Sequence, residues 1–565
     1  MLAKVTILCL LAVILGVPFA MSIVNREPPP PPGAHTLLIV TPHVPQIRRE
    51  FTEAFEHWYE REFGQRVRVD MRTPGGTSEI LTQLQAQLTS EIKRGEIEVT
   101  PEGRITIASG AAAYDIMFGG GSYDHGRLKS GIRLTVPLET SSPLAAALGL
   151  DQLDAINLDG DDLNAASIYD QLGKTPPDGV RIFRDDTGTL KLEVRVPMSQ
   201  PVGFDPATLE QWFGENKIGS QFLYDKDQYW IGTALSSFGI VYNRDLINKL
   251  SLGVPDSFEA LTDPVLIGQV ALADPRQSGS ITTTFDSILG HYGWEQGWRI
   301  LRGMTGNTRY FTNSSTKPPM DVSQGEAAVG LAIDFYGRGQ AQAVGHDRVG
   351  YAEPAGAVYI DADPISVLNG APEPELARRF VQFVLSDEGQ ALWQFPAVTT
   401  EAGRNNPVGP DGQPMGPQRY ELRRMPIRRS MFEQYADAMI DKVNPFKIAS
   451  DTKNPGWRTG VQMMMGAFGI DAGHECTLAW EALAKARATE GFPAQTLAEM
   501  ESAFYAFPPQ IMPDGTELAF TEQNYRAIRN VWRDPIENRK AEIAYVRFFR
   551  NQFAKIVDLE KKASP

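Results

Sequence analysis

The sequence is poor in cysteine and in the short motifs that mark common enzyme classes. It has two cysteines in 565 residues, and Cys9 lies inside an apolar N-terminal run. Cys476 therefore has no partner for an internal disulfide, and no CxxC metal or redox pair is present. HExxH, GxSxG and Walker phosphate-loop patterns are also missing. The sequence thus lacks the motifs of zinc peptidases, serine hydrolases and P-loop ATPases.

Histidine is scarce, and its positions form no cluster along the chain. His125, next to Asp124 in GSYDHGR, is the best isolated catalytic candidate, although a solvated loop histidine is the simpler interpretation. The histidines stand at His35, His43, His57, His125, His291, His346 and His474. We therefore expect no enzyme, no cofactor and no metal site.

Positive charge is in the minority. Lys and Arg number 54 against 69 Asp and Glu, which gives a formal net charge of −15. Such a balance disfavours nucleic acid or an anionic membrane surface as a partner, although a local cleft on an acidic protein can still be electropositive. The apolar share of 42% and charged share of 22% are ordinary for a soluble globular protein.

One long apolar run is present, at the N-terminus. Lys4 precedes twenty uncharged residues over 5–24, long enough as a helix to cross a bilayer. Cleavage after Ala20 and retention as an anchor both remain open, because Pro18 occupies a position where cleavage favours a small residue. Both alternatives place the body outside the cytoplasm. The EPPPPPG segment at 27–33 is a stiff spacer.

The segment after the spacer alternates between strand and helix patterns. LLIVT at 37–41, RVRVDMR at 66–72 and YDIMF at 114–118 have strand patterns, and apolar residues recur at helical spacing between them. This alternation is typical of an α/β protein with a parallel sheet.

Three turns share one design, in which a strand ends, small residues turn the chain and a helix begins. Helix N-termini offer free N–H groups and partial positive charge, so such turns can hold an anion or a polyol. Plain helix capping is the alternative for any one turn. The candidate residues are Gly76, Thr77, Ser78, Gly120, Gly121, Ser122, Ser278, Gly279 and Ser280.

Five further residues are candidate ligand contacts. Arg276 could pair with a phosphate or carboxylate, or it could face solvent. Asp334 could accept hydrogen bonds from a ligand or cap the next helix, and Tyr336 could contact a ligand or pack at a rim. Thr233 and Ser236, in the segment TALSSFGIVYNRDL, are the other two candidates.

The order of segments over about 271–393 resembles that of a known family. ALADPRQSGSITTTFDSILG, NTRYFTNSST, DVSQGEAAVGLAIDFYGRG and YAEPAG follow one another there. They resemble the second lobe and return crossing of type 2 solute-binding proteins of ABC importers. The resemblance is to the branch with ferric-ion, phosphonate and sugar-phosphate receptors.

The resemblance implies two α/β lobes around a hinged cleft, with an insertion and a helical C-terminal extension. We expect the insertion to lie over the rim of the cleft or to form a partner surface. The expected regions are a signal or anchor with spacer (1–34), the first part of lobe 1 (35–137), an inserted subdomain (138–229), lobe 2 (230–350), the return to lobe 1 (351–420) and the extension (421–565).

The implied function is capture of a small anionic or polar solute by hinge closure and its delivery to an ABC permease. We expect a monomer that binds no nucleic acid. Ferric-ion receptors of this branch carry two adjacent tyrosines, whereas this chain has Phe335 and Tyr336, and His43 lies one residue early for the histidine ligand. A ferric receptor, an anchored sensory module and a secreted enzyme on this scaffold remain alternatives.

Overall fold

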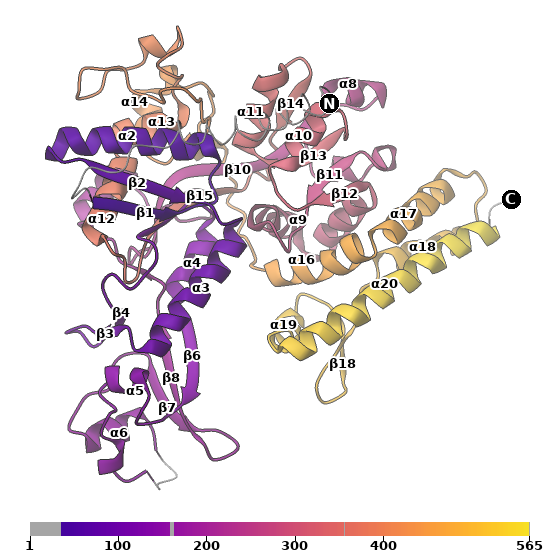
Figure 1. Cartoon of the computed structure of the whole chain (residues 1–565). Coiled ribbons are helices and arrows are strands. Elements are labelled where there is room, and N and C mark those ends of the chain that lie inside the picture. Colours follow the sequence, from indigo (N-terminus) through magenta and orange to yellow (C-terminus); the bar gives the residue numbers. More distant parts are fainter. Residues whose placement is uncertain (1–34, 159–162, 355, 564–565) are drawn as a thin grey trace, which may run out of the picture.

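The computed structural model describes residues 35–158, 163–354 and 356–563. An 11-stranded sheet runs through two lobes in the order β12-β11-β13-β10-β15-β5-β1-β2, with β14 and β16 paired to β10 and β9 paired to β15 (Figure 1). The strands are β1 (His35–Val40), β2 (Val67–Arg72), β5 (Ile116–Phe118), β9 (Ser199–Gln200), β10 (Ile231–Asn243), β11 (Val270–Ala273), β12 (Thr308–Thr312), β13 (Val329–Ile333), β14 (Val349–Ala352), β15 (Ile360–Leu368) and β16 (Met425–Pro426).

Lobe 1 contains the parallel strands β1, β2 and β5. Apolar residues of α2 recur every three or four positions, and Phe51 and Phe55 are fully buried against Trp393 and Phe383. The lobe's helices are α2 (Pro45–Phe63), α3 (Thr77–Arg94), α4 (Ser122–Ser130), α7 (Pro206–Phe213), α12 (Pro374–Val384), α13 (Asp387–Gln394), α14 (Arg429–Gln434) and α15 (Pro445–Ile448). Residues 422–439 therefore complete this core rather than forming a separate extension.

Lobe 2 contains the parallel strands β11, β12 and β13. Its helices are α8 (Arg244–Lys249), α9 (Gly279–Gly306), α10 (Lys317–Gln324) and α11 (Asp334–Val344). Gly293, with φ of 78°, interrupts α9, and the helix is buried on both sides of this break. The buried residues include polar ones such as Thr282 and Asp286 as well as apolar ones.

The two crossing strands make the sheet mixed rather than parallel. β10 pairs antiparallel with β13, β14 and β15, and β15 pairs antiparallel with β5.

A further link between the lobes follows α15. Ser450 N–H donates to Val358 O at 2.9 Å, whereas Trp457 N–H donates to Asp286 of α9 at 2.8 Å. Residues 450–457 thus give the lobes a third connection.

A small subdomain hangs below lobe 1 (Figure 1). Its sheet, β6-β8-β7, contains β6 (Ile132–Pro137), β7 (Val180–Arg184) and β8 (Leu190–Val196), so a hairpin turns at Asp185–Thr189. The sheet begins before residue 138, because β6 is one of its strands. The other elements are β3 (Ile97–Val99), β4 (Ile105–Ile107), α5 (Pro143–Ala147) and α6 (Ala165–Gln171). The core of the subdomain continues into α3.

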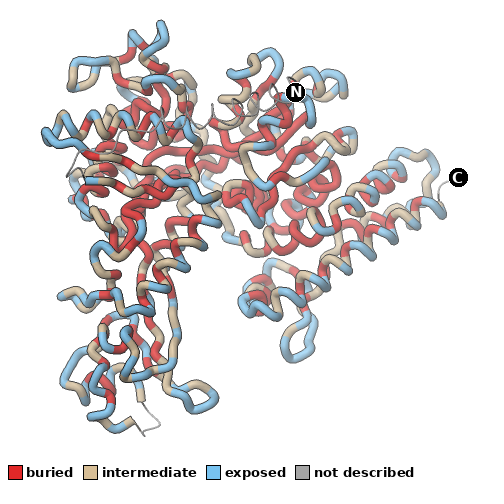
Figure 2. Tube along the Cα trace, in the orientation of Figure 1, coloured by how far each residue is buried: buried red, intermediate tan, exposed pale blue. Residues whose placement is uncertain are grey.

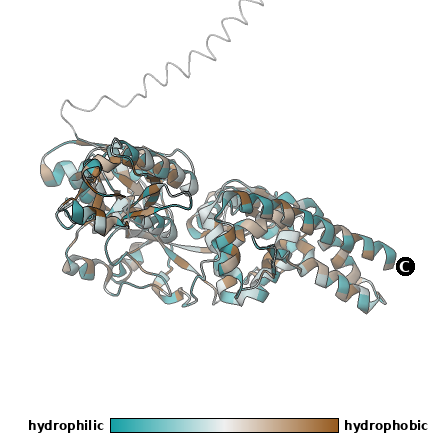
Figure 3. Cartoon of the chain, turned by 90° about the horizontal axis from the view of Figure 1, so that it is seen from below, coloured by the Kyte–Doolittle hydropathy of each residue, from teal (hydrophilic) through white to brown (hydrophobic). Residues whose placement is uncertain are grey.

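The C-terminal helices extend lobe 2. They are α16 (Arg458–Met465), α17 (Gly473–Ala488), α18 (Ala494–Tyr505), α19 (Tyr525–Val531) and α20 (Pro535–Ala563), with a π-helical turn at Gly466–Asp471 and a hairpin of β17 (Gln510–Ile511) and β18 (Glu517–Leu518). Figure 2 shows that their buried residues face lobe 2 and one another, and Phe549 and Phe553 share one core with Leu272 and Phe285. Figure 3 shows these helices projecting beyond lobe 2.

The predicted signal or anchor segment lies outside the described residues. Within the described part of the chain, no helix combines the length and apolar character that a membrane crossing requires.

Candidate functional site

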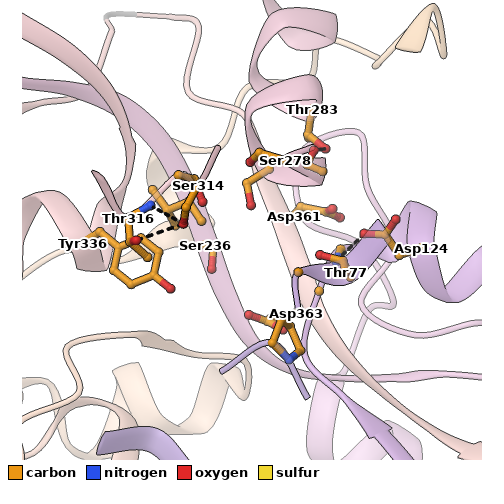
Figure 4. A pocket seen from close by; sticks show the side chains of 18 of the residues that line it. Thr77, Asp124, Ser236, Ser278, Thr283, Ser314, Thr316, Tyr336, Asp361 and Asp363 are labelled. Atoms are coloured by element: carbon orange, nitrogen blue, oxygen red, sulfur yellow. Dashed lines mark hydrogen bonds between the residues drawn. The ribbon is translucent and has the colours of Figure 1, made fainter. Parts of the chain in front are cut away.

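A cavity of about 350 Å³ lies between the two lobes (Figure 4). It opens at the carboxyl ends of β1, β5, β11, β12 and β13, where the chain turns from strand to helix. Ligands in open α/β sheets bind at such ends. Nine of the predicted residues line this cavity: Gly76, Thr77, Gly120, Gly121, Ser236, Ser278, Gly279, Ser280 and Tyr336. The three predicted turns thus share one cavity.

Two of these turns belong to lobe 1 and begin α3 and α4. Both helices have a glycine N-cap, Gly76 and Gly121, and not a hydroxyl residue. Gly120 has φ of 110°, and a Cβ there would stand 2.6 Å from the Thr77 methyl group. Only glycine fits this close approach of the two turns.

The N-cap N–H groups of the lobe 1 turns are already bonded within the chain. Glu79 Oε2 accepts the Gly76 N–H at 2.8 Å, and Asp124 Oδ2 accepts the Gly121 N–H at 3.3 Å. The chain's own carboxylates therefore stand beside the starts of α3 and α4, where they disfavour a second negative charge.

Lobe 2 supplies the opposite wall. Ser278 caps α9, and the first helical hydrogen bond runs from Thr282 N–H to Ser278 O. The N-caps of α10 and α11, Thr316 and Ile333, make no side-chain cap hydrogen bond. Because helix starts leave backbone N–H groups without helical partners, the starts of α9 and α11 present donors to the cavity. The start of α10 does not, because Pro318 and Pro319 carry no N–H and the Lys317 N–H donates to Ser314 O at 3.2 Å.

Arg424 forms the buried floor of the cavity. Its guanidinium donates to Ser236 Oγ at 2.9 Å and to Asp363 Oδ2, and it stands 2.8 Å from His43 Nε2. Its centre lies 4.2 Å from the Phe335 ring centroid, so the floor joins lobe 1 to α11. Burial, followed by the charge of Arg424, holds the pKa of His43 well below its usual value. His43 is therefore neutral and accepts from Arg424 through Nε2.

Two more carboxyls line the cavity beside α4. Asp361 Oδ2 accepts the Ser122 N–H at 3.2 Å, and Asp124 lies on the first turn of α4. Burial raises the pKa of Asp361 to about 6 and raises the pKa of Asp124. The nearby guanidinium of Arg458 opposes both shifts, but it donates to Gly279 O at 3.0 Å and stacks on Tyr123 at 4.2 Å.

Five predicted residues do not line the cavity. Ser78 follows Thr77 on α3, and Ser122 is engaged by Asp361, which accepts its backbone N–H at 3.2 Å and interacts with its hydroxyl. Thr233 is fully buried and donates to Asp363 O at 2.7 Å. Arg276 turns away, because its guanidinium pairs with Asp274 at 3.0 Å and with Asp471 at 3.3 Å.

Asp334 also points away from the cavity, into the hinge. Its Oδ1 accepts the Ser237 N–H at 3.2 Å, and its Oδ2 has no hydrogen-bond partner among the described residues. Burial raises the pKa of Asp334 to about 7. Asp334 therefore contacts the crossing strand β10. It is neither a ligand contact in the cavity nor the N-cap of α11.

Several lining residues were missed in the sequence analysis. Ser314, Ser315 and Thr316 follow β12 in the same small-residue design as the three predicted turns, so this signal was available. Asp361 and Asp363 interrupt an otherwise apolar strand, which also marks them. The other missed residues are Pro42, His43, Glu79, Asp124, Phe238, Gln277, Thr283, Asn313, Ile333, Phe335, Ala362 and Arg424.

The inserted subdomain is placed away from this cavity, not over its rim. Residues 138–229 supply none of the cavity's described lining. The predicted position of the subdomain is therefore corrected, because its sheet hangs from the far end of α3 and α4 (Figure 1).

Metal ligands are sparse in the described chain. No group of three or more His, Cys, Asp and Glu side chains is arranged to hold a metal ion there. Tyr336 supplies one phenol to the cavity, and the neighbouring ring is Phe335, with centroids 4.1 Å apart. If a hard cation were bound in this cavity through phenolate oxygens, Tyr336 would be the one tyrosine ligand among the lining residues.

His125 is a buried structural residue, not a solvated loop histidine. It is fully buried, with Nδ1 2.7 Å from Ser366 Oγ and Nε2 3.1 Å from Gly119 O. Burial lowers the pKa of His125 to about 4. The folded state thus binds fewer protons here than the unfolded chain, so this contribution to stability is lost as pH falls from about 6.5 toward 4.

We expect His125→Gln to destabilise the protein less at low pH than at neutral pH. The loss in unfolding free energy relative to wild type should shrink by up to about 3 kcal/mol between pH 7 and pH 4. Urea unfolding of both proteins across this range measures the difference. A gap that stays constant with pH would contradict the assignment of a neutral buried imidazole.

The comparisons with known proteins concern the middle of the chain. Residues 214–415 match the family described as bacterial extracellular solute-binding protein. An uncharacterized protein of Haemophilus influenzae is 28% identical over 169 residues, which are 30% of this chain and 48% of that protein. The phosphoglycerate transport regulatory protein PgtC of Salmonella typhimurium is 23% identical over 226 residues, 39% of this chain and 54% of that protein.

The chain thus spans about half the length of the curated relatives that it matches. Among solved structures, the periplasmic binding protein AfuA of Actinobacillus pleuropneumoniae has a TM-score of 0.44 and 14% identity, over 76% of this chain and 98% of that one. Iron-bound HitA of Pseudomonas aeruginosa has a TM-score of 0.42 and 15% identity, over 76% and 99%. The family match over residues 214–415 confirms that this part of the chain is similar to bacterial extracellular solute-binding proteins, as the resemblance predicted.

Proposed function

We propose that this protein captures a small polar or anionic solute between its lobes outside the cytoplasm and delivers it to an ABC permease. The observation that carries the proposal is the single cavity shared by the starts of α3 and α4 on one side of the interlobe boundary and of α9 on the other. A solute held there contacts both lobes at once. It therefore stabilises the closed arrangement over the open one.

The lining supports binding without turnover. Hydroxyls, backbone N–H groups and carboxyls surround the cavity, and its histidine, His43, is neutral and engaged by Arg424. Such groups hold a ligand by hydrogen bonds, and no activated nucleophile is arranged among the lining residues. We expect a bound solute to be recovered chemically unchanged after incubation with the protein, as measured by mass spectrometry.

A sensory or regulatory module is the second candidate. The relative in Salmonella typhimurium is named a phosphoglycerate transport regulatory protein. In this chain the C-terminal helices offer additional surface that could engage a receptor instead of a permease. Co-purification from membranes with a permease would support the first candidate, and co-purification with a sensor protein would support the second.

Filling the cavity should abolish binding. We expect Ser280→Phe to weaken the affinity for any bound solute at least about tenfold, because a phenyl ring occupies a large share of a 350 Å³ space. Ser280 lies on the first turn of α9 and is partly exposed, so the fold should persist. Isothermal calorimetry against anions, polyols, amines and ferric ion measures the effect.

Gln85→Phe is the matched control, since Gln85 is an exposed residue of α3 outside the cavity. It should bind like the wild type. Equal affinity of Ser280→Phe and wild type would place the solute elsewhere, and would count against the proposed site.

A further inference from the structure

The cavity has two chemically different sides. Figure 4 shows Asp124 and Asp361 with Thr77 on one side, and Ser314, Thr316 and Tyr336 on the other. The carboxyls in the lining come from lobe 1 and the crossing strand β15: Glu79, Asp124, Asp361 and Asp363. The lining residues of lobe 2 are all uncharged. A ligand that fills the cavity therefore has carboxyl groups beside one of its ends and uncharged residues beside the other.

The acidic side has no free basic side chain in the cavity lining, since Arg458 lies near Asp124 and Asp361 but outside the lining and donates to Gly279 O at 3.0 Å. Arg424, the cavity's lining arginine, is already bound to Asp363. Asp361 is 5% exposed, and its Oδ1 has no hydrogen-bond partner among the described residues. A buried carboxylate oxygen without a partner is costly, so this atom favours a ligand that donates to it with a positive charge.

The opposite side offers donors instead. Thr316 and Ile333 begin α10 and α11 without a side-chain cap, and both line the cavity. Ser314 Oγ accepts the Thr316 N–H at 3.3 Å, so its hydroxyl proton remains available to a ligand or to Thr316 Oγ, 2.9 Å away. The hydroxyls of Ser314, Thr316 and Tyr336, with no carboxyl among the lining residues of lobe 2, favour an acidic ligand group.

We propose that the solute is zwitterionic: its phosphoryl or carboxyl group lies against Ser314, Thr316 and Tyr336, and its ammonium group lies between Asp361 and Asp124. This inference rests on the proposed function and names the ligand class of the same site. It replaces the expectation of a simple anion, because the carboxyls of Glu79, Asp124, Asp361 and Asp363 line one side of the cavity.

The surroundings of Asp361 decide how pH acts on this contact. Ser122 of α4 donates to Asp361 and Asp124 lies nearby, while Arg458 of α16 and Tyr359 of the segment just before β15 also interact with it electrostatically. Burial raises the pKa of Asp361 to about 6. An ammonium group binds the ionised carboxylate, so its affinity should fall as pH drops below about 6.

Matched ligand pairs test the inference. The purified protein is titrated calorimetrically with 2-aminoethyl phosphate against 2-hydroxyethyl phosphate, and with 4-aminobutanoate against 4-hydroxybutanoate. We expect the amine of at least one pair to bind at least about tenfold tighter at pH 7.5, since a charge-assisted hydrogen bond is roughly twice as strong as a neutral one. The carboxylate pair is also measured at pH 5, because phosphate esters themselves titrate near pH 6.

Asp361→Asn is the diagnostic variant. Asparagine keeps an oxygen that accepts the Ser122 N–H but removes the charge. We expect the preference for the amine to fall to about twofold or less, with little change for the hydroxyl member. Asp437→Asn, at an exposed residue, should keep the wild-type preference.

The outcomes separate this inference from the proposed function. Equal or tighter binding of the hydroxyl members, or binding confined to anions or polyols without an amine, overturns the zwitterion and leaves solute capture intact. An amine preference that survives in Asp361→Asn also overturns it. If no member of the four and no other anion, polyol or amine binds, both proposals fail.

Discussion

Arg424→Met should lower the free energy of unfolding by about 3–5 kcal/mol, which is the range for removing one partner of a buried ion pair. Asp363 would be left 5% exposed without its guanidinium partner, and its Oδ1 already has no partner among the described residues. His43 would lose its hydrogen bond as well. Urea unfolding and thermal melts measure the loss, with a shift in Tm of about 2–4 °C expected for a chain of 565 residues that unfolds as one unit.

Adding Asp363→Asn to Arg424→Met isolates the cause. Because the second change removes the stranded charge, the double variant should recover a large part of the lost free energy. Arg404→Met, at an exposed residue in a 3-10 turn, should change stability by less than about 0.5 kcal/mol. A double variant less stable than Arg424→Met would show that the charge pair is not the source.

Arg302→Ala should also lower the free energy of unfolding by about 3–5 kcal/mol, as for truncation of a large core side chain. Arg302 on α9 is 1% exposed, and its centre lies 4.0 Å from the Phe468 ring and 4.6 Å from the Phe549 ring. Its Nη1 donates to Phe504 O at 2.7 Å, whereas its Nε and Nη2 have no partner among the described residues. Thermal melts measure the loss.

Arg302→Met provides the contrast. Methionine keeps most of the packing and removes a buried charge whose electrostatic neighbours among the described residues include no carboxylate. Burial lowers the pKa of Arg302 to about 10, which is the sign of an unfavourable site for the charge. We expect Arg302→Met to lie within about 1 kcal/mol of wild type. A loss equal to that of Arg302→Ala would mean that the attraction between guanidinium and rings exceeds the cost of burial.

Local patterns predicted the turns of the cavity because their causes are local. A strand that ends in small residues and continues as a helix places its turn at the sheet's edge, and the turns at Gly76, Gly121 and Ser278 all follow this rule. The same rule applied to 314–316 would have added the α10 side of the cavity.

Long-range partners were beyond the reach of these patterns. Arg424 and His43 stand 381 residues apart in sequence, and Arg424 lies outside the segment that resembles the family. For Arg276, by contrast, a partner close in the sequence decides where the side chain points. Its neighbour Asp274, two residues earlier, takes the guanidinium that could have served a ligand.

The C-terminal helices have a consequence for the order of folding. Phe549, Phe553 and Ile556 complete the same apolar core as Val270 and Leu272, almost three hundred residues earlier in the chain. The part of the lobe 2 core that these helices cover is therefore completed only when nearly the whole chain has been synthesised, and such distant contacts fold slowly. Until α20 emerges, the apolar residues beneath it remain accessible to chaperones.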